Sequence, residues 1–369
     1  MRVCMVVPYD LAEQGGVKRH AFQLATALRA LGDDVTVMGP SSAGTDDPAV
    51  HVFGGVVNIR SNGSDNRLAV LVPPWRIRDW LRARAFDVVH VHEPLCPLLG
   101  PYAAMFAGAA GRVATFHAFA EHEGLAPRVL RWWSGPFVLR HVDRAIAVSE
   151  PAARYARFVW KRPLSIIPNG IALGEPAAPA PPHDGALRLL FVGHWRDPRK
   201  GLPVLLAALA QLHDRGLAVT LDVVGAGPDG AEPPQLAGVA FHGPVASEHE
   251  IAAHLARCDV LVAPALGQES FGIVLLEAMA AARPIVCSDI AGFREVVGRA
   301  NARFALPGSP EALATAIAEL AEQPQLRRAL AEANLVHVRR FAWSELVHRV
   351  RAEYRAAIAA RGGRLREAS

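Results

Sequence analysis

Paired cysteines are missing from this chain of 369 residues. Its four cysteines are widely spaced and include no Cys-x-x-Cys pair, which excludes a disulfide framework and a zinc knuckle and favours a reducing compartment. We also expect no secretion signal, because the apolar run at residues 3–7 is short and a Gly-Gly turn soon follows it. The sequence therefore predicts a cytoplasmic protein. The four cysteines are Cys4, Cys96, Cys258 and Cys287.

Long apolar runs are also missing. The longest weakly polar stretch, residues 97–111, contains prolines and glycines and is shorter than the roughly 18 residues that a membrane-spanning helix needs. Any contact with a membrane is therefore expected to be peripheral. No internal repeat is found, which excludes a solenoid.

Lysine is scarce, with only Lys18, Lys161 and Lys200 among 39 basic residues. Residues 1–172 carry 19 basic against 14 acidic residues, and residues 173–369 carry 20 against 21. This near balance and an aromatic content of 7% disfavour a nucleic-acid partner. The chain has no Gly-x-Gly-x-x-Gly fingerprint, which disfavours a nicotinamide enzyme, and no Walker A motif.

What is present is the pattern of a parallel α/β fold. Residues 3–7 resemble a buried strand, a Gly-Gly turn and helical spacing follow, and residues 34–39 return to a strand pattern. This order is a βαβ unit, whose crossover requires a parallel sheet. Further strand patterns end in polar residues, where α/β folds bind ligands. They lie at residues 87–92, 112–117 and 145–149.

A proline- and alanine-rich segment, residues 174–186, predicts a linker between two domains. A second series of strand patterns begins after it, at residues 187–193, 219–225, 259–262 and 284–287. We therefore expect two doubly wound Rossmann-like domains, residues 1–173 and 187–349, that face each other across a cleft. The tail is helical in pattern over residues 343–360, and about residues 350–369 are expected to rejoin the first domain.

Two glutamates flank the start of a predicted apolar helix. Glu269 is expected in the loop before the helix, where unpaired N–H groups and the helix dipole favour an anion, and Glu277 about two turns further along. One carboxylate can bind sugar hydroxyls and the other ribose hydroxyls. Alternatively, Glu269 stabilises the helix start and Glu277 is a solvated surface residue. The predicted helix interior contains Ile273, Leu276 and Ala280.

A second motif is the loop after the strand at residues 187–193. It carries three cations, Arg196, Arg199 and Lys200, within five residues. Such a loop suits a diphosphate, because fixed cations neutralise a leaving group without a metal. The alternative is an exposed basic loop, but the scarcity of lysine favours a functional role for Lys200.

Together these motifs resemble the retaining nucleotide-sugar glycosyltransferases of family 4, which have the two-domain GT-B fold. The Glu269 and Glu277 pair, with seven residues between, is highly specific for that class. Other segments resemble the bacterial phosphatidylinositol mannosyltransferases. This resemblance implies GDP-mannose as donor, the inositol ring of a lipid in an anionic membrane as acceptor, and no metal or cofactor. The matching segments are residues 5–9, 15–17, 62–64 with Arg67, 91–94, 114–117, 147–150, 167–170, 193–201 and 267–280.

The resemblance also implies a role for single residues. Expected around the donor are Gly16, His194, Arg199, Lys200, Val245, Glu269, Ser270, Phe271, Gly272, Ile273, Val274 and Glu277. Expected around the acceptor are Tyr9, Lys18, Asn62 and Arg67. Expected catalytic residues are His117, Arg196, Lys200 and Glu269. Without the resemblance, a histidine at a strand end such as His117 more often has a packed structural role.

Three positions depart from the family pattern. His194 stands where the family has arginine, so either a protonated His194 or Arg196 would bind phosphate. Ala172 replaces the usual aspartate, and Lys18 replaces the glutamine of the mannosyltransferases and suits a more acidic acceptor. The resemblance implies front-face attack, in which the departing phosphate oxygen accepts the proton of the acceptor.

Residues 73–84 mix Trp, Ile and Leu with four arginines. This pattern predicts either a helix on an anionic membrane surface or an amphipathic helix packed on its own sheet. Arg128, Arg131, Trp132 and Trp133 form a second such cluster. We therefore expect a peripheral protein on the inner face of the cell membrane. Two alternatives stay open: a UDP-sugar or a soluble acceptor such as an inositol phosphate, and a sugar-nucleotide-binding scaffold without turnover.

Overall fold

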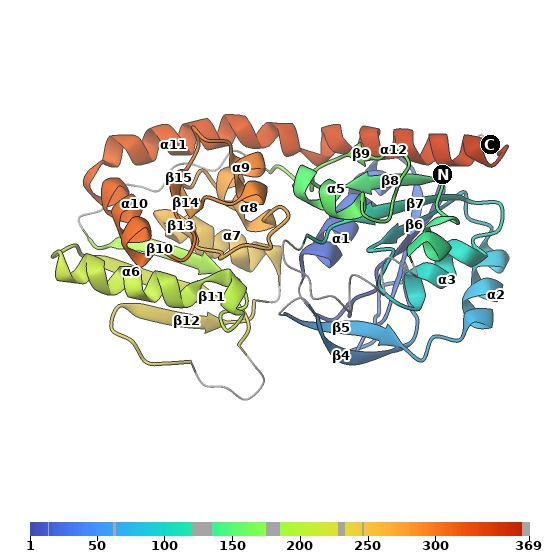
Figure 1. Cartoon of the computed structure of the whole chain (residues 1–369), viewed down its shortest axis with the longest axis horizontal. Helices are drawn as coiled ribbons and strands as arrows, with labels where there is room; N and C mark the ends of the chain where they lie inside the picture. The colour runs from blue at the N-terminus through green and yellow to red at the C-terminus, as the bar shows by residue number, and fades with distance from the viewer. Residues whose placement is uncertain are drawn as a thin grey trace. The chain divides into compact units, whose positions relative to one another are not determined.

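The computed structural model describes residues 1–13, 15–61, 64–119, 135–174, 185–227, 233–245 and 247–363, with the backbone alone for residues 59–61 and 64–66. The chain divides into two compact units (Figure 1). The first unit comprises Met1–Ala172 and Phe341–Ser369, and the second comprises Leu173–Arg340. Most of the predicted linker, residues 175–184, lies outside the described residues.

The first unit is built on a seven-stranded parallel sheet in the order β3-β2-β1-β6-β7-β8-β9. Its central strands are buried along almost their whole length, as expected of a parallel sheet covered by helices. The sequence predicted this α/β class, and the structure confirms it. The strands are β1 (Arg2–Val6), β2 (Asp34–Gly39), β3 (Val50–Val52), β6 (Val88–His92), β7 (Gly111–Phe116), β8 (Arg144–Ala147) and β9 (Ser165–Ile166).

An antiparallel pair, β4 (Gly55–Ser61) and β5 (Ser64–Val70), forms a separate two-stranded sheet in the first unit. An isolated bridge between Tyr9 and Leu68 joins β5 to the segment after β1. The hairpin therefore lies next to the carboxyl end of the first strand. The sequence analysis did not predict these two strands.

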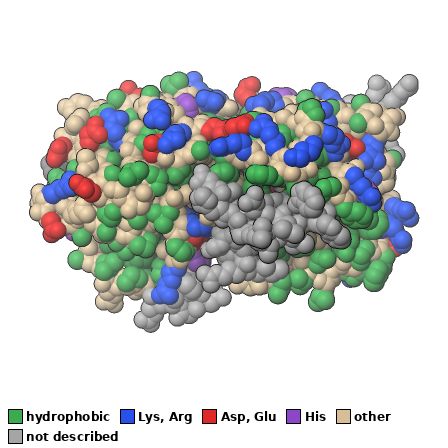
Figure 2. Space-filling view, viewed as in Figure 1, with side chains coloured by type: hydrophobic (Ala, Val, Ile, Leu, Met, Phe, Trp, Pro, Cys, Tyr) green, Lys and Arg blue, Asp and Glu red, His purple; other side chains and the backbone are tan. Residues whose placement is uncertain are grey.

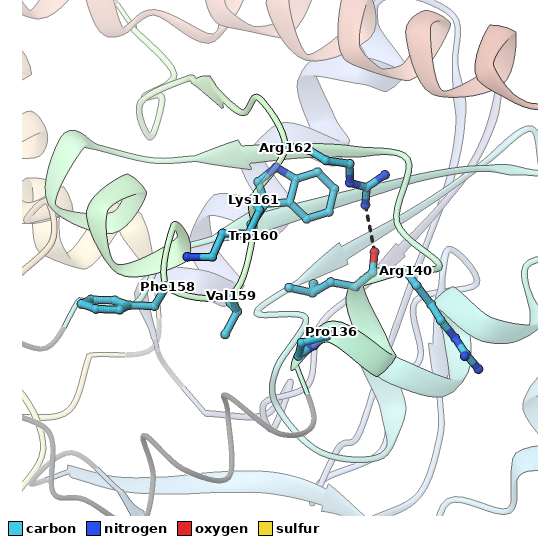
Figure 3. A pocket seen from close by; sticks show the side chains of 8 residues that line it. Pro136, Arg140, Phe158, Val159, Trp160, Lys161 and Arg162 are labelled. Carbon is cyan, nitrogen blue, oxygen red and sulfur yellow. Dashed lines mark hydrogen bonds between the residues drawn. The ribbon is translucent and has the colours of Figure 1, made fainter.

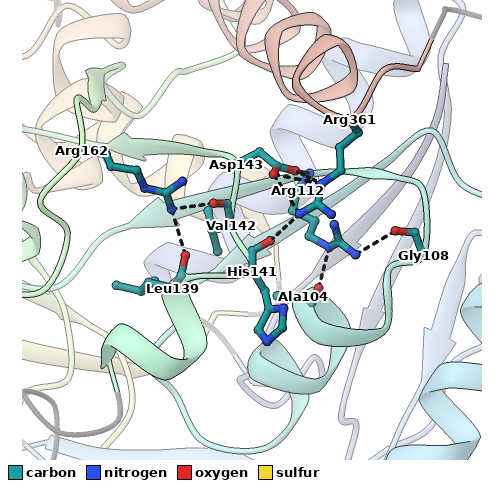
Figure 4. A network of polar contacts seen from close by, with 9 residues as sticks. All are labelled: Ala104, Gly108, Arg112, Leu139, His141, Val142, Asp143, Arg162 and Arg361. Atoms are coloured by element: carbon teal, nitrogen blue, oxygen red, sulfur yellow. Dashed lines mark hydrogen bonds and ion pairs between the residues drawn. The ribbon is translucent and has the colours of Figure 1, made fainter.

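The C-terminal helix α12 (Trp343–Ala360) belongs to the first unit and packs on α1, β7 and β8. Its first residue donates a hydrogen bond from Trp343 Nε1 to Gln23 Oε1 at 3.0 Å. At its other end Arg361 Nε lies 2.9 Å from Asp143 Oδ2, within a network that Figure 4 shows. Polar contacts thus fix both ends of α12. The other helices of this unit are α1 (Gly16–Ala30), α2 (Pro74–Arg84), α3 (Leu99–Phe106) and α5 (Glu150–Ala156).

The second unit has a six-stranded parallel sheet in the order β12-β11-β10-β13-β14-β15. Its strands are β10 (Leu187–Val192), β11 (Val219–Val224), β12 (Val239–Gly243), β13 (Val260–Ala263), β14 (Ile285–Ser288) and β15 (Arg303–Ala305). Its helices are η1 (Pro198–Lys200), α6 (Leu202–Asp214), α7 (Glu248–Arg257), α8 (Ile273–Ala280), α9 (Ala291–Val297), α10 (Pro310–Glu322) and α11 (Pro324–His337), and the short η2 (Val338–Phe341) precedes α12.

Each unit has its own apolar core on the faces of its sheet. Figure 2 shows basic side chains next to acidic ones over the C-terminal helices, so the charge on this face is mixed. Among the described residues, none of the helices combines the length and the apolar character needed to cross a membrane.

Candidate active site

The loop after β10 brings two sequence motifs of the second unit together. Lys200 Nζ lies 2.5 Å from Glu269 Oε1, although 69 positions separate the two residues. Leu266 donates its N–H to the carbonyl of Arg199 at 2.8 Å, so the two loops are also joined through their backbones. Gly201, at φ +73°, is required at this contact, because a Cβ would lie 1.9 Å from the carbonyl oxygen of Pro264. Two motifs of opposite charge therefore form one site.

The other cations of this loop differ in their surroundings. The guanidinium of Arg199 is bound by Asp197, with Nη2 at 2.7 Å from Oδ2, and Asp197 also accepts the Arg199 N–H at 3.0 Å. Arg196 is exposed and stacks over Trp195, with 4.9 Å between its Cζ and the ring centroid. His194 is exposed as well. Arg196 and His194 can therefore turn towards an anion, whereas Asp197 already holds Arg199 in place.

Glu269 lies before α8, as predicted, and Glu277 is the fifth residue of the helix. Both are half-buried, as are Ser270 and Ile273. Gly272 precedes the helix at φ +91°, in the left-handed region that favours glycine. Phe271 and Val245 are buried, Val274 is half-buried, and Val245 follows strand β12.

The predicted interior of this helix was partly wrong. Leu276 is buried, but Ile273 and Ala280 are only half-buried. The reason is that the buried face of α8, against which α9 and α11 pack, is centred on Leu275 and Met279, which leaves Ile273 and Ala280 together at its margin. The residues that it buries are Leu275, Leu276, Ala278 and Met279.

Gly292 supports the loop that carries Glu269, and sequence reasoning did not find it. A Cβ at Gly292 would lie 2.3 Å from the carbonyl oxygen of Glu269 and 2.8 Å from the carbonyl carbon of Ser270. These are backbone atoms, so Gly292→Ala displaces the loop. We expect the substitution to lower turnover at this site by up to about a hundredfold, the rate cost of a displacement near 1 Å. Gly174→Ala, where a Cβ meets no atom within 4 Å, is the control, and equal turnover of the two variants would contradict this role.

In the first unit, His117 directly follows β7 and is buried. Its backbone N–H and that of Ala118 both donate to Glu93 Oε1, at 2.5 and 2.6 Å. Its Nε2 lies 3.0 Å from His92 Nδ1. Glu93 adopts φ +49°, which turns its carboxylate towards this strand end. The position of His117 is thus fixed through both its backbone and its ring.

Three further histidines surround this position. The ring centroid of His20 lies 4.7 Å from that of His117 and 5.3 Å from that of His92. His90 lies at hydrogen-bond distance, 2.7 Å, from both Tyr354 Oη and Thr115 Oγ1. Burial lowers the pKa of His20 to about 4 and that of His90 to about 3, and it holds the pKa values of His92 and His117 well below their usual range. All four rings are therefore neutral at pH 7.

The residues expected at the acceptor gather around two carboxylates that the sequence analysis did not single out. Arg67 Nη1 lies 2.6 Å from Glu13 Oε1, and Arg67 Nε lies 3.3 Å from Asp10 Oδ2. Burial lowers the pKa of Lys18, while Asp10 and Glu13 act in the opposite direction. Tyr9 is joined to this group through its bridge to Leu68. The structure thus brings Tyr9, Lys18 and Arg67 to one end of the sheet.

The Asp10 carboxylate is ionised in this arrangement. Burial alone would raise its pKa, but hydrogen bonds from the N–H groups of Ser42 and Ala12 and the charge of Arg67 outweigh burial and lower the pKa. Gly16 is the exposed first residue of α1. Asn62 and the cluster at residues 128–133 lie outside the described residues.

Helix α2 packs on its own sheet with one face and exposes aromatic and basic residues on the other, so it combines the two alternatives that the sequence left open. Ile77 and Leu81 are buried in the core of the first unit, so the helix packs on its own sheet. Its other face exposes Trp75, at 61% of its surface, together with Arg76 and Arg82. This exposed face has an aromatic ring beside two cations and one carboxylate, that of Asp79.

A cavity of about 330 Å³ lies elsewhere in the first unit, and sequence reasoning did not find it (Figure 3). Its apolar wall includes Trp160 and Phe158, and Lys161 and Arg140 are among its cations. Arg162 donates to the carbonyls of Leu139 and Val142 at 2.9 and 2.6 Å, which fixes one side of the cavity (Figure 4). Such a lining suits a ligand with both an apolar and an anionic part.

Comparisons with known proteins agree with this geometry. The family described as Glycosyltransferase Family 4 matches residues 14–175, and the one described as Glycosyl transferases group 1 matches residues 186–323. The chain is similar to the phosphatidyl-myo-inositol mannosyltransferases of Mycolicibacterium smegmatis (37% identity, 93% of this chain, 91% of the relative) and Mycobacterium leprae (36% identity, 100% of both). In fold it is similar to Anabaena HepE, solved with UDP and glucose (TM-score 0.73, 19% identity, 95% of this chain, 98% of the other).

Proposed function

Since the chain belongs to glycosyltransferase family 4, we propose that it transfers mannose from GDP-mannose to the inositol ring of phosphatidylinositol. The observation that carries this proposal is the pairing of Lys200 with Glu269 at 2.5 Å. It places a cation suited to a phosphate directly beside a carboxylate suited to sugar hydroxyls. The names of the relatives supply the acceptor.

The proposed reaction retains the configuration of the sugar and needs no metal. As the bond between sugar and diphosphate breaks, negative charge develops on the departing phosphate. Lys200, Arg196 and the N-terminus of α8 are positioned within the second unit to stabilise such charge. The acceptor hydroxyl oxygen bonds to the anomeric carbon on the face that the phosphate leaves, and the departing phosphate oxygen accepts the proton of that hydroxyl. Asp197 keeps Arg199 oriented and reduces the entropy lost when a phosphate binds.

Glu269 and His117 act in this proposal as positioning groups. Lys200 orients the carboxylate of Glu269. In this orientation the carboxylate accepts hydrogen bonds from sugar hydroxyls. His117 is neutral because burial lowers its pKa, so it can offer a hydrogen bond to an uncharged sugar without adding a charge. A neutral imidazole suits this role, whereas stabilising the charge of the diphosphate would require a cation.

The acceptor side is proposed around Lys18 and Arg67. Both cations have carboxylate neighbours, Asp10 and Glu13, which offset part of their charge. A phosphodiester can then replace Glu13 as the anion bound to Arg67. Asp10 stays ionised and keeps its hydrogen bonds from two N–H groups. This arrangement suits an acceptor that combines hydroxyls with one phosphate.

Nucleotide release tests the proposal. GDP and UDP are measured from GDP-mannose, UDP-glucose and UDP-N-acetylglucosamine, each with and without phosphatidylinositol vesicles and without added metal. GDP release from GDP-mannose only with vesicles present is the expected result. Release from a UDP-sugar overturns the donor, release with inositol phosphate but not with vesicles overturns the lipid acceptor, and binding without release from any donor indicates a scaffold.

We also propose that the exposed face of α2 binds an anionic membrane peripherally. Trp75 supplies an interfacial aromatic ring, and Arg76 and Arg82 supply attraction of about 1 kcal/mol each near a negative surface. We expect the protein to float with anionic vesicles at low salt, and Arg76→Glu with Arg82→Glu to abolish flotation. Arg215→Glu, on an exposed residue of the second unit, is the control, and flotation that survives the paired change contradicts the assignment.

A further inference from the structure

Two groups of three potential metal ligands occur among the described residues: His20 with His92 and His117, and Asp222 with His242 and His254. In the first group every residue is more than nine-tenths buried. The second group lies at the edge of the sheet in the second unit, where it is half-buried or exposed. An ion can reach this second group from solvent.

The second group comes from three separate elements. Asp222 is on β11, His242 on the edge strand β12 and His254 on α7. One ligand atom of each residue lies within 4.8 Å of the ligand atoms of the other two. His242 Nε2 and Asp222 Oδ1 are 2.8 Å apart, and the rings of His242 and His254 are 4.7 Å apart between centroids. A modest rotation of side chains would bring the three atoms to the spacing of one tetrahedral ion.

The backbone of β12 is adapted to this arrangement. Val223 pairs with Phe241 and Val224 pairs with Gly243, so His242 is the extra residue of a β-bulge. Bulges re-aim side chains and are rare in parallel pairs. This one directs His242 to Asp222 on the neighbouring strand. A hydrogen bond to Asp222 explains the orientation of the His242 ring, but it does not explain why the His254 ring lies beside these two groups.

His254 has the properties of a ligand without an ion. Within the part of the chain that the structure describes, its ring makes no hydrogen bond, although it lies beside the ring of His242 and within reach of the Asp222 carboxylate. The Arg257 guanidinium of the same helix donates to the carbonyl of Ala253 at 3.3 Å.

We propose that Asp222, His242 and His254 bind a divalent transition metal, Zn²⁺ by preference, with water as the fourth ligand. Two imidazoles and one carboxylate are a donor set for Zn²⁺, whereas Mg²⁺ and Ca²⁺ require oxygen donors. The ion would link edge strand β12 to α7 and β11. It is separate from the proposed transfer reaction, which uses no metal.

Metal binding by the full chain, freed of metal with a chelator, tests this site. We expect one Zn²⁺ per chain by calorimetry, and one Co²⁺ with the visible absorption of a tetrahedral site. His242→Ala and His254→Ala should each weaken Zn²⁺ binding by at least about tenfold. His249→Ala, which removes an exposed histidine of the same helix α7, should leave binding unchanged.

Circular dichroism without metal verifies that each variant is folded. Because the ligands lie at the surface, we expect both alanine variants to keep their secondary structure. The proposal is overturned if the unchanged protein binds no Zn²⁺, or if both variants bind it as tightly as the unchanged protein. The latter result would place the ion elsewhere, such as among His20, His92 and His117.

Discussion

Lys200→Ala should lower the turnover of sugar transfer by roughly 10²–10³-fold, the usual effect of removing one group that stabilises charge in a transition state. The substitution removes the cation beside the proposed phosphate position. It also leaves the Glu269 carboxylate, only 17% exposed, without the ammonium at 2.5 Å. Turnover measured as GDP release at saturating GDP-mannose tests this expectation.

The stability of the same variant should change little. Lys200 is 32% exposed, and ion pairs that solvent reaches contribute about 0–1 kcal/mol. Arg215→Ala is the control, because it removes an exposed cation of the same unit that lies on the surface away from the motifs of the site. Turnover of Lys200→Ala within twofold of the control, or a loss that merely follows unfolding, would contradict a role in the reaction.

Acid should unfold the first unit steeply, because its four buried histidines resist protonation. An unfolded histidine binds its proton near pH 6.5, whereas in the fold burial lowers the pKa of His20 to about 4 and that of His90 to about 3. Their contribution to stability is therefore complete above pH 6.5 and is lost as the pH falls towards the folded pKa values. His20 alone accounts for about 3 kcal/mol.

Urea unfolding at several pH values between 7 and 4.5 measures this loss. We expect the free energy of unfolding to fall by about 1.4 kcal/mol per pH unit for each proton taken up on unfolding. His20→Gln should make this dependence shallower, and His249→Gln, on an exposed helix position, should not. Equal pH dependence in the two variants would show that the buried cluster does not control acid stability.

The sequence predicted the fold class because apolar runs and their helical intervals are local signals. The helix at residues 343–360 agrees with α12 at both ends, and each predicted strand has a counterpart. The hairpin of β4 and β5 was missed, because its strands mix apolar with polar residues and form a two-stranded sheet separate from the main one. Strand β12 was missed for a similar reason, since it is a half-exposed edge strand.

The candidate site was less accessible to sequence reasoning wherever it depends on long-range packing. The family motifs pointed to Lys200 and Glu269, but only the fold could show that they meet. His20 has no local pattern that marks it, and it joins His92 and His117 because α1 packs on α12, which covers β7, while β6 pairs with β7. Glu93 lies in a segment that the resemblance marked, but its bonds to the backbone of His117 and Ala118 are visible only in the fold.

The first unit is assembled from the two ends of the chain, so it cannot be completed until synthesis ends. The first unit includes α12, whose Trp343 ring would collide with any Cβ at Gly170, 2.4 Å away, and whose Tyr354 is fully buried against His90. A ribosome that has passed Ala172 must still add the whole second unit before this helix exists. At about 5–20 residues per second, that delay is roughly 10–35 s. The chain of the second unit is therefore complete first, and the first unit cannot complete its core until the end of synthesis.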